Sequence, residues 1–188
     1  MGWTGMRPMI FVTVAFAAAA IAPLTGCVTG EPQGGTPMAL VNALGAPIGS
    51  VRAWQTAGGV TFRVTAAGLP HGVHGIHVHA VGRCDPPDFA SAGPHWNPAA
   101  RKHGFSNPAG HHAGDLPNVE VAANGVLSAT VTLPGASLTA PGPAGVLIDN
   151  DGASIVIHAV ADDYLTDPSG NSGARIACAV ITPTPELR

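Results

Sequence analysis

The chain has 188 residues, of which only 10% are charged, and its formal net charge is -3. With eight basic residues it lacks the electrostatic footprint of a nucleic-acid binder, so that class of partner is excluded. The 25 glycines, 18 prolines and nine histidines are more informative. After removal of an export signal, the remaining length is that of one domain, large enough to bury its own core.

Residues 1–26 have the pattern of an export signal. Arg7 precedes an uncharged apolar run from Met9 to Ala22. The run is shorter than the about 20 residues that span a bilayer, which argues against a permanent anchor helix. Leu24 to Cys27 resemble the bacterial lipobox, which implies cleavage before Cys27 and lipid on its sulfur. Ordinary secretory cleavage, which would leave a free cysteine, is the alternative.

Residues 27–37 are predicted to form a flexible tether, because glycine, proline and polar residues dominate from Val28 to Pro37. The predicted folded domain spans residues 38–188. Lipid on Cys27 would make the protein an extracytoplasmic, membrane-anchored lipoprotein, either periplasmic or on the cell surface.

Eight short strands are predicted from the alternation of apolar and polar residues, which is clearest in Val60 to Thr65 and Leu127 to Leu133. Turn signals such as Asn124-Gly125 separate the runs. The strands lie near residues 38–44, 48–56, 60–67, 73–80, 117–122, 126–133, 153–161 and 174–182. This pattern indicates an all-β antiparallel sandwich or barrel.

Two connections, 81–116 and 162–173, are long for such a fold. The first is rich in His, Gly, Pro and Asn, and the second in Asp, Ser and Gly. Long ordered loops in compact all-β domains usually carry function.

Cys84 and Cys178 remain as an even pair once Cys27 is assigned to lipid. An oxidising compartment favours a disulfide between them, and two buried thiols are the alternative. The bridge would stabilise the fold by roughly 4 to 5 kcal/mol through unfolded-state entropy.

His77 and His79 lie two apart in a predicted strand, so both imidazoles project from one face and can bind one metal ion. His158 lies in a second apolar strand, where a histidine needs a polar partner. The first long loop adds three histidines and a carboxylate: His95, His103, His112 and Asp115.

The ligand types suit two different metals. Three imidazoles and one carboxylate suit a closed zinc site, and four neutral imidazoles suit Cu(II). Four ligands for each metal make eight positions for seven residues. One histidine must therefore be shared.

Five segments resemble motifs of copper-zinc superoxide dismutase: Gly75 to His79, Ser91 to Pro98, His112 to Leu116, Ile157-His158 and Gly173 to Cys178. The resemblance covers about Met38 to Ile181. It implies an eight-stranded antiparallel Greek-key β-barrel with two long functional loops, and one copper and one zinc ion per subunit.

The resemblance also implies the role of each residue. Copper would be bound by His77, His79, His95 and His158, and zinc by His95, His103, His112 and Asp115, with His95 as the bridge. Asp162 would hydrogen-bond one ligand histidine of each metal. Arg175 would orient superoxide beside copper, and Cys84 and Cys178 match the family disulfide.

The implied reaction converts superoxide to oxygen and hydrogen peroxide by a Cu(II)/Cu(I) cycle, with His95 and Arg175 as catalytic residues. A non-catalytic copper- or zinc-binding lipoprotein and an inactive interaction module are the alternatives. Arg175 and a bridging His95 argue against both, because metal binding alone needs neither.

The expected partners are superoxide and, through Cys27, a membrane; a homodimer is left open. His71, His74 and His111 match no ligand position and are expected to be solvated loop histidines. Because the loop 162–173 is short and contains no lysine, strong electrostatic steering of the substrate is not assumed.

Overall fold

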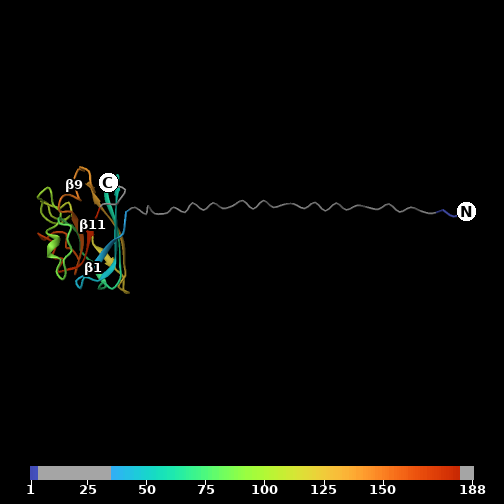
Figure 1. Ribbon diagram of the computed structural model, residues 1–188, viewed down its shortest axis with the longest axis horizontal. Helices are drawn as coiled ribbons and strands as arrows, with labels where there is room; N and C mark the ends of the chain where they lie inside the picture. The colour runs from blue at the N-terminus through green and yellow to red at the C-terminus, as the bar shows by residue number, and fades with distance from the viewer. Residues whose placement is uncertain (4–34, 183–188) are drawn as a thin grey trace. The chain divides into compact units, whose positions relative to one another are not determined.

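The computed structural model describes residues 1–3 and 35–182, and Figure 1 traces the chain. It divides into two compact units, Met1–Pro32 and Gln33–Arg188. The predicted export signal, the lipid site at Cys27 and most of the predicted tether lie outside the described residues. In the described part of the chain, no helix has the length and apolar character needed to cross a membrane.

The second unit is built from strands, and seven of them form one curled antiparallel sheet. These are β1 (Met38–Asn42), β2 (Pro47–Thr56), β3 (Gly59–Ala66), β5 (Ile76–His79), β7 (Leu127–Pro134), β10 (Ala153–His158) and β11 (Arg175–Ile181). Their order is β5-β10-β11-β1-β2-β3-β7. The all-β antiparallel fold class is therefore confirmed.

Four shorter strands lie outside this sheet. β4 (Gly72–His74) pairs with β6 (Val119–Val121), and β8 (Ala136–Ser137) pairs in parallel with β9 (Gly145–Val146). The only helical element of the described residues is a 3-10 turn, η1 (Ala90–Ala92).

All eight predicted strand ranges contain a strand, but the strand count differs from the prediction. The range 73–80 is divided at Gly75, whose N–H donates to Val160 O (2.9 Å) and whose carbonyl accepts from His158 N (2.8 Å). These bonds replace a continuous ladder, so β4 and β5 pair with different partners. The two-residue strands β8 and β9 were not predicted, because Gly- and Pro-rich residues around them give no period-two signal.

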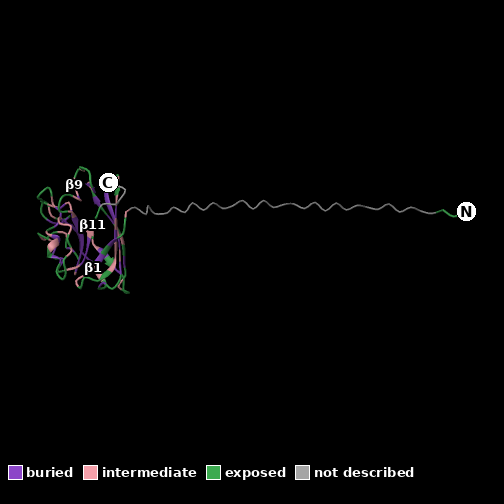
Figure 2. Ribbon diagram, in the orientation of Figure 1, coloured by how far each residue is buried: buried purple, intermediate pink, exposed green. Residues whose placement is uncertain are grey.

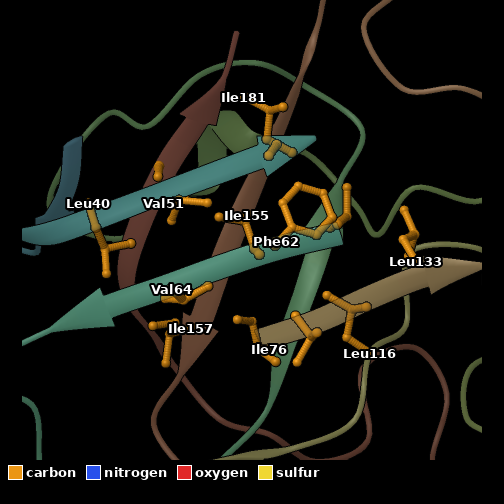
Figure 3. Close-up of a cluster of buried hydrophobic side chains, with 14 of the residues drawn as sticks. Leu40, Val51, Phe62, Val64, Ile76, Leu116, Leu133, Ile155, Ile157 and Ile181 are labelled. Atoms are coloured by element: carbon orange, nitrogen blue, oxygen red, sulfur yellow. The ribbon is translucent and has the colours of Figure 1, made fainter. Parts of the chain in front are cut away.

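The core lies on the inner face of the curled sheet. Alternate residues of the strands point there, and Figure 2 shows the buried residues concentrated along the strands and the exposed ones along the loops. Each large aliphatic or aromatic side chain buried in this way contributes about 1.5–3 kcal/mol. Figure 3 shows the central ones: Leu40, Val51, Phe62, Val64, Ile76, Leu116, Leu133, Ile155, Ile157 and Ile181.

The outer face of β5 and β10 carries the residues of interest. Ile76 and Val78 enter the core, so His77 and His79 project outward, opposite Val156 and Ser154 of β10. The loop 81–116 crosses this outer face and is attached to it by a second apolar cluster, formed by Phe89, Ala92, Val156 and Cys178. The sheet and the loop together enclose the candidate site.

Candidate metal centre

Four histidines from three distant segments converge on the outer face of the sheet. One ring nitrogen each of His77, His79, His95 and His158 lies within 4.8 Å of the others. β5 supplies two of these residues, the end of β10 supplies His158, and the long loop supplies His95 through a backbone bridge to His79. These are the four residues that the sequence predicts to bind copper.

In each of these four histidines, one ring nitrogen is hydrogen-bonded and the other is not. His77 Nε2 lies 2.8 Å from Asp162, His79 Nδ1 lies 2.8 Å from Gly93 O, and His158 Nδ1 lies 3.2 Å from Gly173 O. The opposite nitrogens are buried and have no protein partner: His77 Nδ1, His79 Nε2, His95 Nε2 and His158 Nε2. Buried polar atoms are rarely left without a partner, so these nitrogens fit a metal ion.

A second group shares His95 with the first. It contains His95, His103, His112 and Asp115, again within 4.8 Å of one another and all buried. Asp115 Oδ1 lies 2.9, 3.0 and 3.3 Å from the Nδ1 atoms of His95, His103 and His112 respectively. Three imidazoles and one carboxylate at a common point are the donor set of a closed zinc site.

Asp162 connects the two groups. Its Oδ2 contacts His77 of the first group at 2.8 Å, and its Oδ1 contacts His103 of the second at 3.0 Å. This matches the role that the sequence resemblance implies. Each contact fixes which ring nitrogen faces the metal position.

Asn118 holds Asp162 in place, and this role was not predicted from the sequence. Its side-chain oxygen accepts from Asp162 N, and its side-chain nitrogen donates to Asp162 O, both at 2.9 Å. A single asparagine after a proline gives no recognisable signal in the sequence. Its role depends on a contact with a loop more than forty positions away.

Burial sets the charge of the first group. It lowers the pKa of His79 to about 2 and the pKa of both His95 and His158 to about 4. Burial also lowers the pKa of His77, although the hydrogen bond with Asp162 opposes this effect. All four imidazoles are therefore neutral at neutral pH, which is the state that binds a metal ion.

In the second group, His103 favours its charged form, whereas the shared His95 stays neutral. Burial alone would disfavour protonation of His103, but its hydrogen bonds to Asp115 and Asp162 raise its pKa to about 9. Burial likewise opposes ionisation of both aspartates, yet hydrogen bonds from the histidines hold their pKa values well below the ordinary range. The position between His103 and Asp115 thus stabilises a cation.

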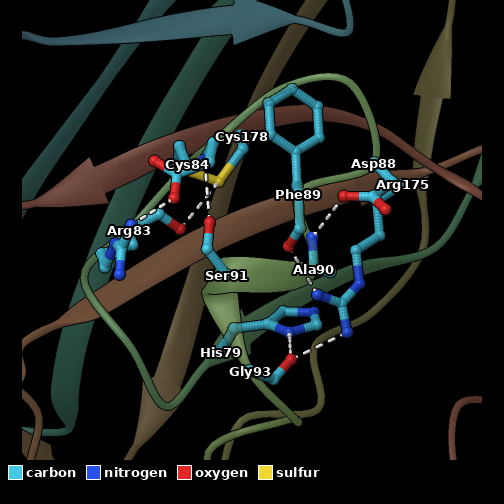
Figure 4. Close-up of a disulfide and its surroundings, with 11 residues drawn as sticks. His79, Arg83, Cys84, Asp88, Phe89, Ala90, Ser91, Gly93, Arg175 and Cys178 are labelled. Atoms are coloured by element: carbon cyan, nitrogen blue, oxygen red, sulfur yellow. Dashed lines mark hydrogen bonds and ion pairs between the residues drawn. A yellow bond between two sulfur atoms is a disulfide. The ribbon is translucent and has the colours of Figure 1, made fainter.

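Arg175 lies at the edge of the first group, where β11 pairs with His158. Its guanidinium donates to Phe89 O (2.7 Å) and Gly93 O (2.8 Å), both in the long loop. Gly93 O also contacts His79, so one carbonyl links the arginine to this histidine, as Figure 4 shows. The side chain remains half-buried and borders a cleft.

The cleft has a volume of about 1440 Å³ and reaches both groups, since His95, His112 and His158 line it. Arg101 and Lys102 of the first long loop also border it. The cations that border the cleft therefore come from β11 and from the first long loop, and those of the loop were not predicted from the sequence.

A disulfide joins Cys84 to Cys178, which confirms the predicted pairing. The Cα atoms are 5.7 Å apart, and the bridge closes a separation of 94 residues. The bridge attaches the loop 81–116, whose carbonyls bind the Arg175 guanidinium, to β11, the strand that contains Arg175 (Figure 4).

The prediction that His74 is a solvated loop residue is wrong. It is only 2% exposed, and its ring nitrogens lie 2.8 Å from His158 O and 2.9 Å from Pro70 O. The alternation of strand faces could have predicted this burial, because His74 lies two and four positions before the core residues Ile76 and Val78. His71 and His111 are exposed, as expected.

The fold and the paired groups define a class: an antiparallel β protein with two adjacent candidate metal sites that share one histidine. A family model described as copper/zinc superoxide dismutase matches residues 48–181. The chain therefore belongs to the copper/zinc superoxide dismutase family. Copper and zinc are the metals of that family, and the two groups could hold them.

Individual relatives agree with this assignment. A superoxide dismutase-like protein of Bacillus subtilis is 44% identical over 144 residues, covering 76% of this chain and 73% of the relative. A copper-zinc superoxide dismutase of Aquifex aeolicus is 43% identical over 143 residues, covering 76% and 84%. The crystal structure of a SOD-like protein from Bacillus subtilis has a TM-score of 0.75 and 43% identity, covering 79% of this chain and 99% of that one.

Proposed function

We propose that this protein is a superoxide dismutase that binds copper at His77, His79, His95 and His158 and zinc at His95, His103, His112 and Asp115. The observation that supports it most is the shared His95, whose Nδ1 faces Asp115 while its buried Nε2 has no protein partner. A histidine between two donor sets is what a bridged pair of metals requires.

Each side chain then has a definite task. Copper, when bound, would supply the one-electron chemistry by which one superoxide is oxidised to oxygen and another is reduced to hydrogen peroxide, and zinc would supply the charge that orders His95. Arg175 binds and orients the anion, because two backbone carbonyls fix its guanidinium beside the cleft. His95 would donate one of the two protons of hydrogen peroxide from Nε2 when that nitrogen is not occupied by the metal, and water would donate the other. Asp162 keeps His77 and His103 in the required orientation.

The test is to load the purified protein with copper and zinc, measure both metals, and assay superoxide removal. The variants His95→Ala and His158→Ala should lose most of the activity. His111→Ala is the matched control, because this exposed histidine belongs to neither group, and it should retain activity. A fully metallated but inactive wild type would refute the proposal.

Metal binding without catalysis is the second candidate. It is favoured by the name of one relative, a superoxide dismutase-like protein. It predicts full copper and zinc occupancy with no superoxide removal in the same assay. The contacts that position Arg175 at the cleft argue for the enzyme, because binding alone does not need them.

We also propose that the protein is exported from the cytoplasm and anchored to a membrane by lipid on Cys27. The folded domain would then be extracytoplasmic. The lipobox-like Leu24 to Cys27 and the apolar run before it support this proposal. Mass spectrometry of the mature N-terminus should find acyl chains on Cys27. Cys27→Ser should release the protein from membranes, and an unlipidated mature wild type would contradict the proposal.

A further inference from the structure

The second long loop contacts the first through Asp167, a residue that belongs to neither metal group. Asp167 Oδ1 accepts from the backbone N–H of His103 at 2.8 Å, and its Oδ2 accepts from Lys102 Nζ at 3.0 Å. Lys102 is the only lysine of the chain. One carboxylate thus binds two consecutive residues of the other loop, and the second of them is a proposed zinc ligand.

His103 is held at its ring and at the amides on both sides of its α-carbon. Asp162 binds ring Nε2 at 3.0 Å, Asp167 binds the amide of His103, and Asp115 Oδ2 accepts from the next amide, Gly104 N, at 2.9 Å. The ring and one amide are thus fixed by groups close to the metals. Asp167 supplies the remaining restraint from outside the site.

The carboxylate is suited to this task although it is exposed. An aspartate is ionised at neutral pH, and each of its two oxygens accepts one hydrogen bond here, from His103 N–H and from Lys102 Nζ. Lys102 occupies the second oxygen and thereby restricts rotation of the carboxylate. The ion pair itself lies in water and contributes little stability, so the hydrogen bond to the His103 amide is the main interaction.

We propose that Asp167 is a positioning residue for the zinc site, which orders the backbone at His103 so that its Nδ1 faces Asp115. The inference rests on the proposed zinc assignment. Residues that orient ligands from outside the first coordination sphere commonly change metal affinity by about 10- to 100-fold. Asp167 acts on the backbone, so we expect an effect near the lower end of this range.

Three substitutions separate its two contacts. Asp167→Ala removes both, Asp167→Asn keeps one oxygen that can accept from His103 N–H, and Lys102→Met removes only the ion pair. Asp163→Ala is the matched control: Asp163 is an exposed carboxylate of the same loop and binds Leu165 N, Thr166 and Asn171, but nothing in the first loop.

The measurement is the rate at which zinc leaves the fully metallated protein for a chromogenic chelator, together with the visible absorption spectrum of the protein with Co(II) in the zinc site. Asp167→Ala should release zinc about ten-fold faster and alter the Co(II) bands. Asp167→Asn should restore most of both properties, and Lys102→Met should have a smaller effect than Asp167→Ala.

An effect of equal size in Asp163→Ala would show that only loop loosening is measured and would overturn the inference. So would an unchanged release rate and spectrum in Asp167→Ala. These outcomes differ from a failure of the proposed function, in which the wild type itself binds no zinc or, with both metals bound, does not remove superoxide.

Discussion

The backbone of Arg175 pairs with His158, but its guanidinium hydrogen-bonds to carbonyls of the long loop, and it shares one of these acceptors with a histidine of the first group. Its guanidinium and His79 both donate to Gly93 O. The arginine should therefore affect the substrate more than the metal.

We predict that Arg175→Ala lowers the rate of superoxide removal by about 10- to 100-fold while copper and zinc contents stay unchanged. This corresponds to the about 1.5–3 kcal/mol of a hydrogen bond to a charged group. The measurements are the catalytic rate and the metal content of the same sample. Arg83→Ala is the control, because Arg83 is exposed and pairs with Asp85. Loss of copper from Arg175→Ala would show that its role is structural.

Gly170 lies against the residue that connects the two groups. Its φ is +64°, and a Cβ there would overlap Asp162 Oδ1 and lie 2.8 Å from His103 Nε2. We predict that Gly170→Ala displaces the Asp162 carboxylate and weakens binding of both metals by about ten-fold or more. Competition with chelators measures this effect.

Gly68→Ala is the control for the glycine substitution. Its φ of +79° carries the same backbone strain, but a Cβ there meets no atom within 4 Å. Equal metal loss in both variants would attribute the effect to strain alone.

At the residue scale, the sequence was sufficient to identify the residues that converge in the two groups and insufficient to predict the contacts that hold them. The seven residues were recognisable because histidines and an aspartate at fixed spacing are rare outside metal sites. His74 and Asn118 bind the backbone of His158 and Asp162 respectively, and such contacts depend on how distant segments pack. Their residue types alone carry no such information.

At the scale of elements, period-two alternation predicted β7 because only one face of it is buried, whereas β10 is buried on both faces and was predicted as an apolar segment. The path of the loop 81–116 could not be predicted, since it depends on its apolar attachment to the sheet through Phe89 and on long-range backbone bonds such as Gly82 N to Asp151 O, 2.7 Å. The loop is attached in two ways, by the disulfide and by Phe89.

We predict that replacing both Cys84 and Cys178 with serine lowers the free energy of unfolding by up to about 5 kcal/mol, because the unfolded chain gains the entropy of an open loop. Activity should fall less, since Phe89, which is fully buried, still attaches the loop that binds Arg175. Urea unfolding and the superoxide assay measure the two effects.

Phe89→Ala provides the comparison for the disulfide variant. It keeps the bridge but removes the apolar attachment next to the carbonyl that binds Arg175. For a given loss of unfolding free energy, Phe89→Ala should therefore lower the activity more than the double serine variant does. The reverse order would show that the disulfide alone positions the arginine.

At the scale of the whole molecule, the free energy of unfolding of the metal-free protein depends on pH. Four buried histidines have a pKa below the ordinary 6.5, and His103 has one above it. A lowered pKa gives stability that is present above 6.5 and is lost as the pH falls, because the unfolded chain then binds more protons. The raised pKa of His103 has the opposite sign: its contribution is complete below 6.5 and is lost as the pH rises towards about 9.

We therefore predict that the metal-free protein is most stable near neutral pH and loses stability steeply between about pH 6.5 and 4, at up to about 1.4 kcal/mol per pH unit for each histidine that titrates. His103 cannot compensate there, because its contribution no longer changes below 6.5. Urea midpoints in the presence of a chelator measure the curve. His79→Gln should flatten the acid limb, since burial holds the pKa of His79 at about 2. An acid limb that is the same in the wild type and in His79→Gln would contradict the assignment of the loss to the buried histidines.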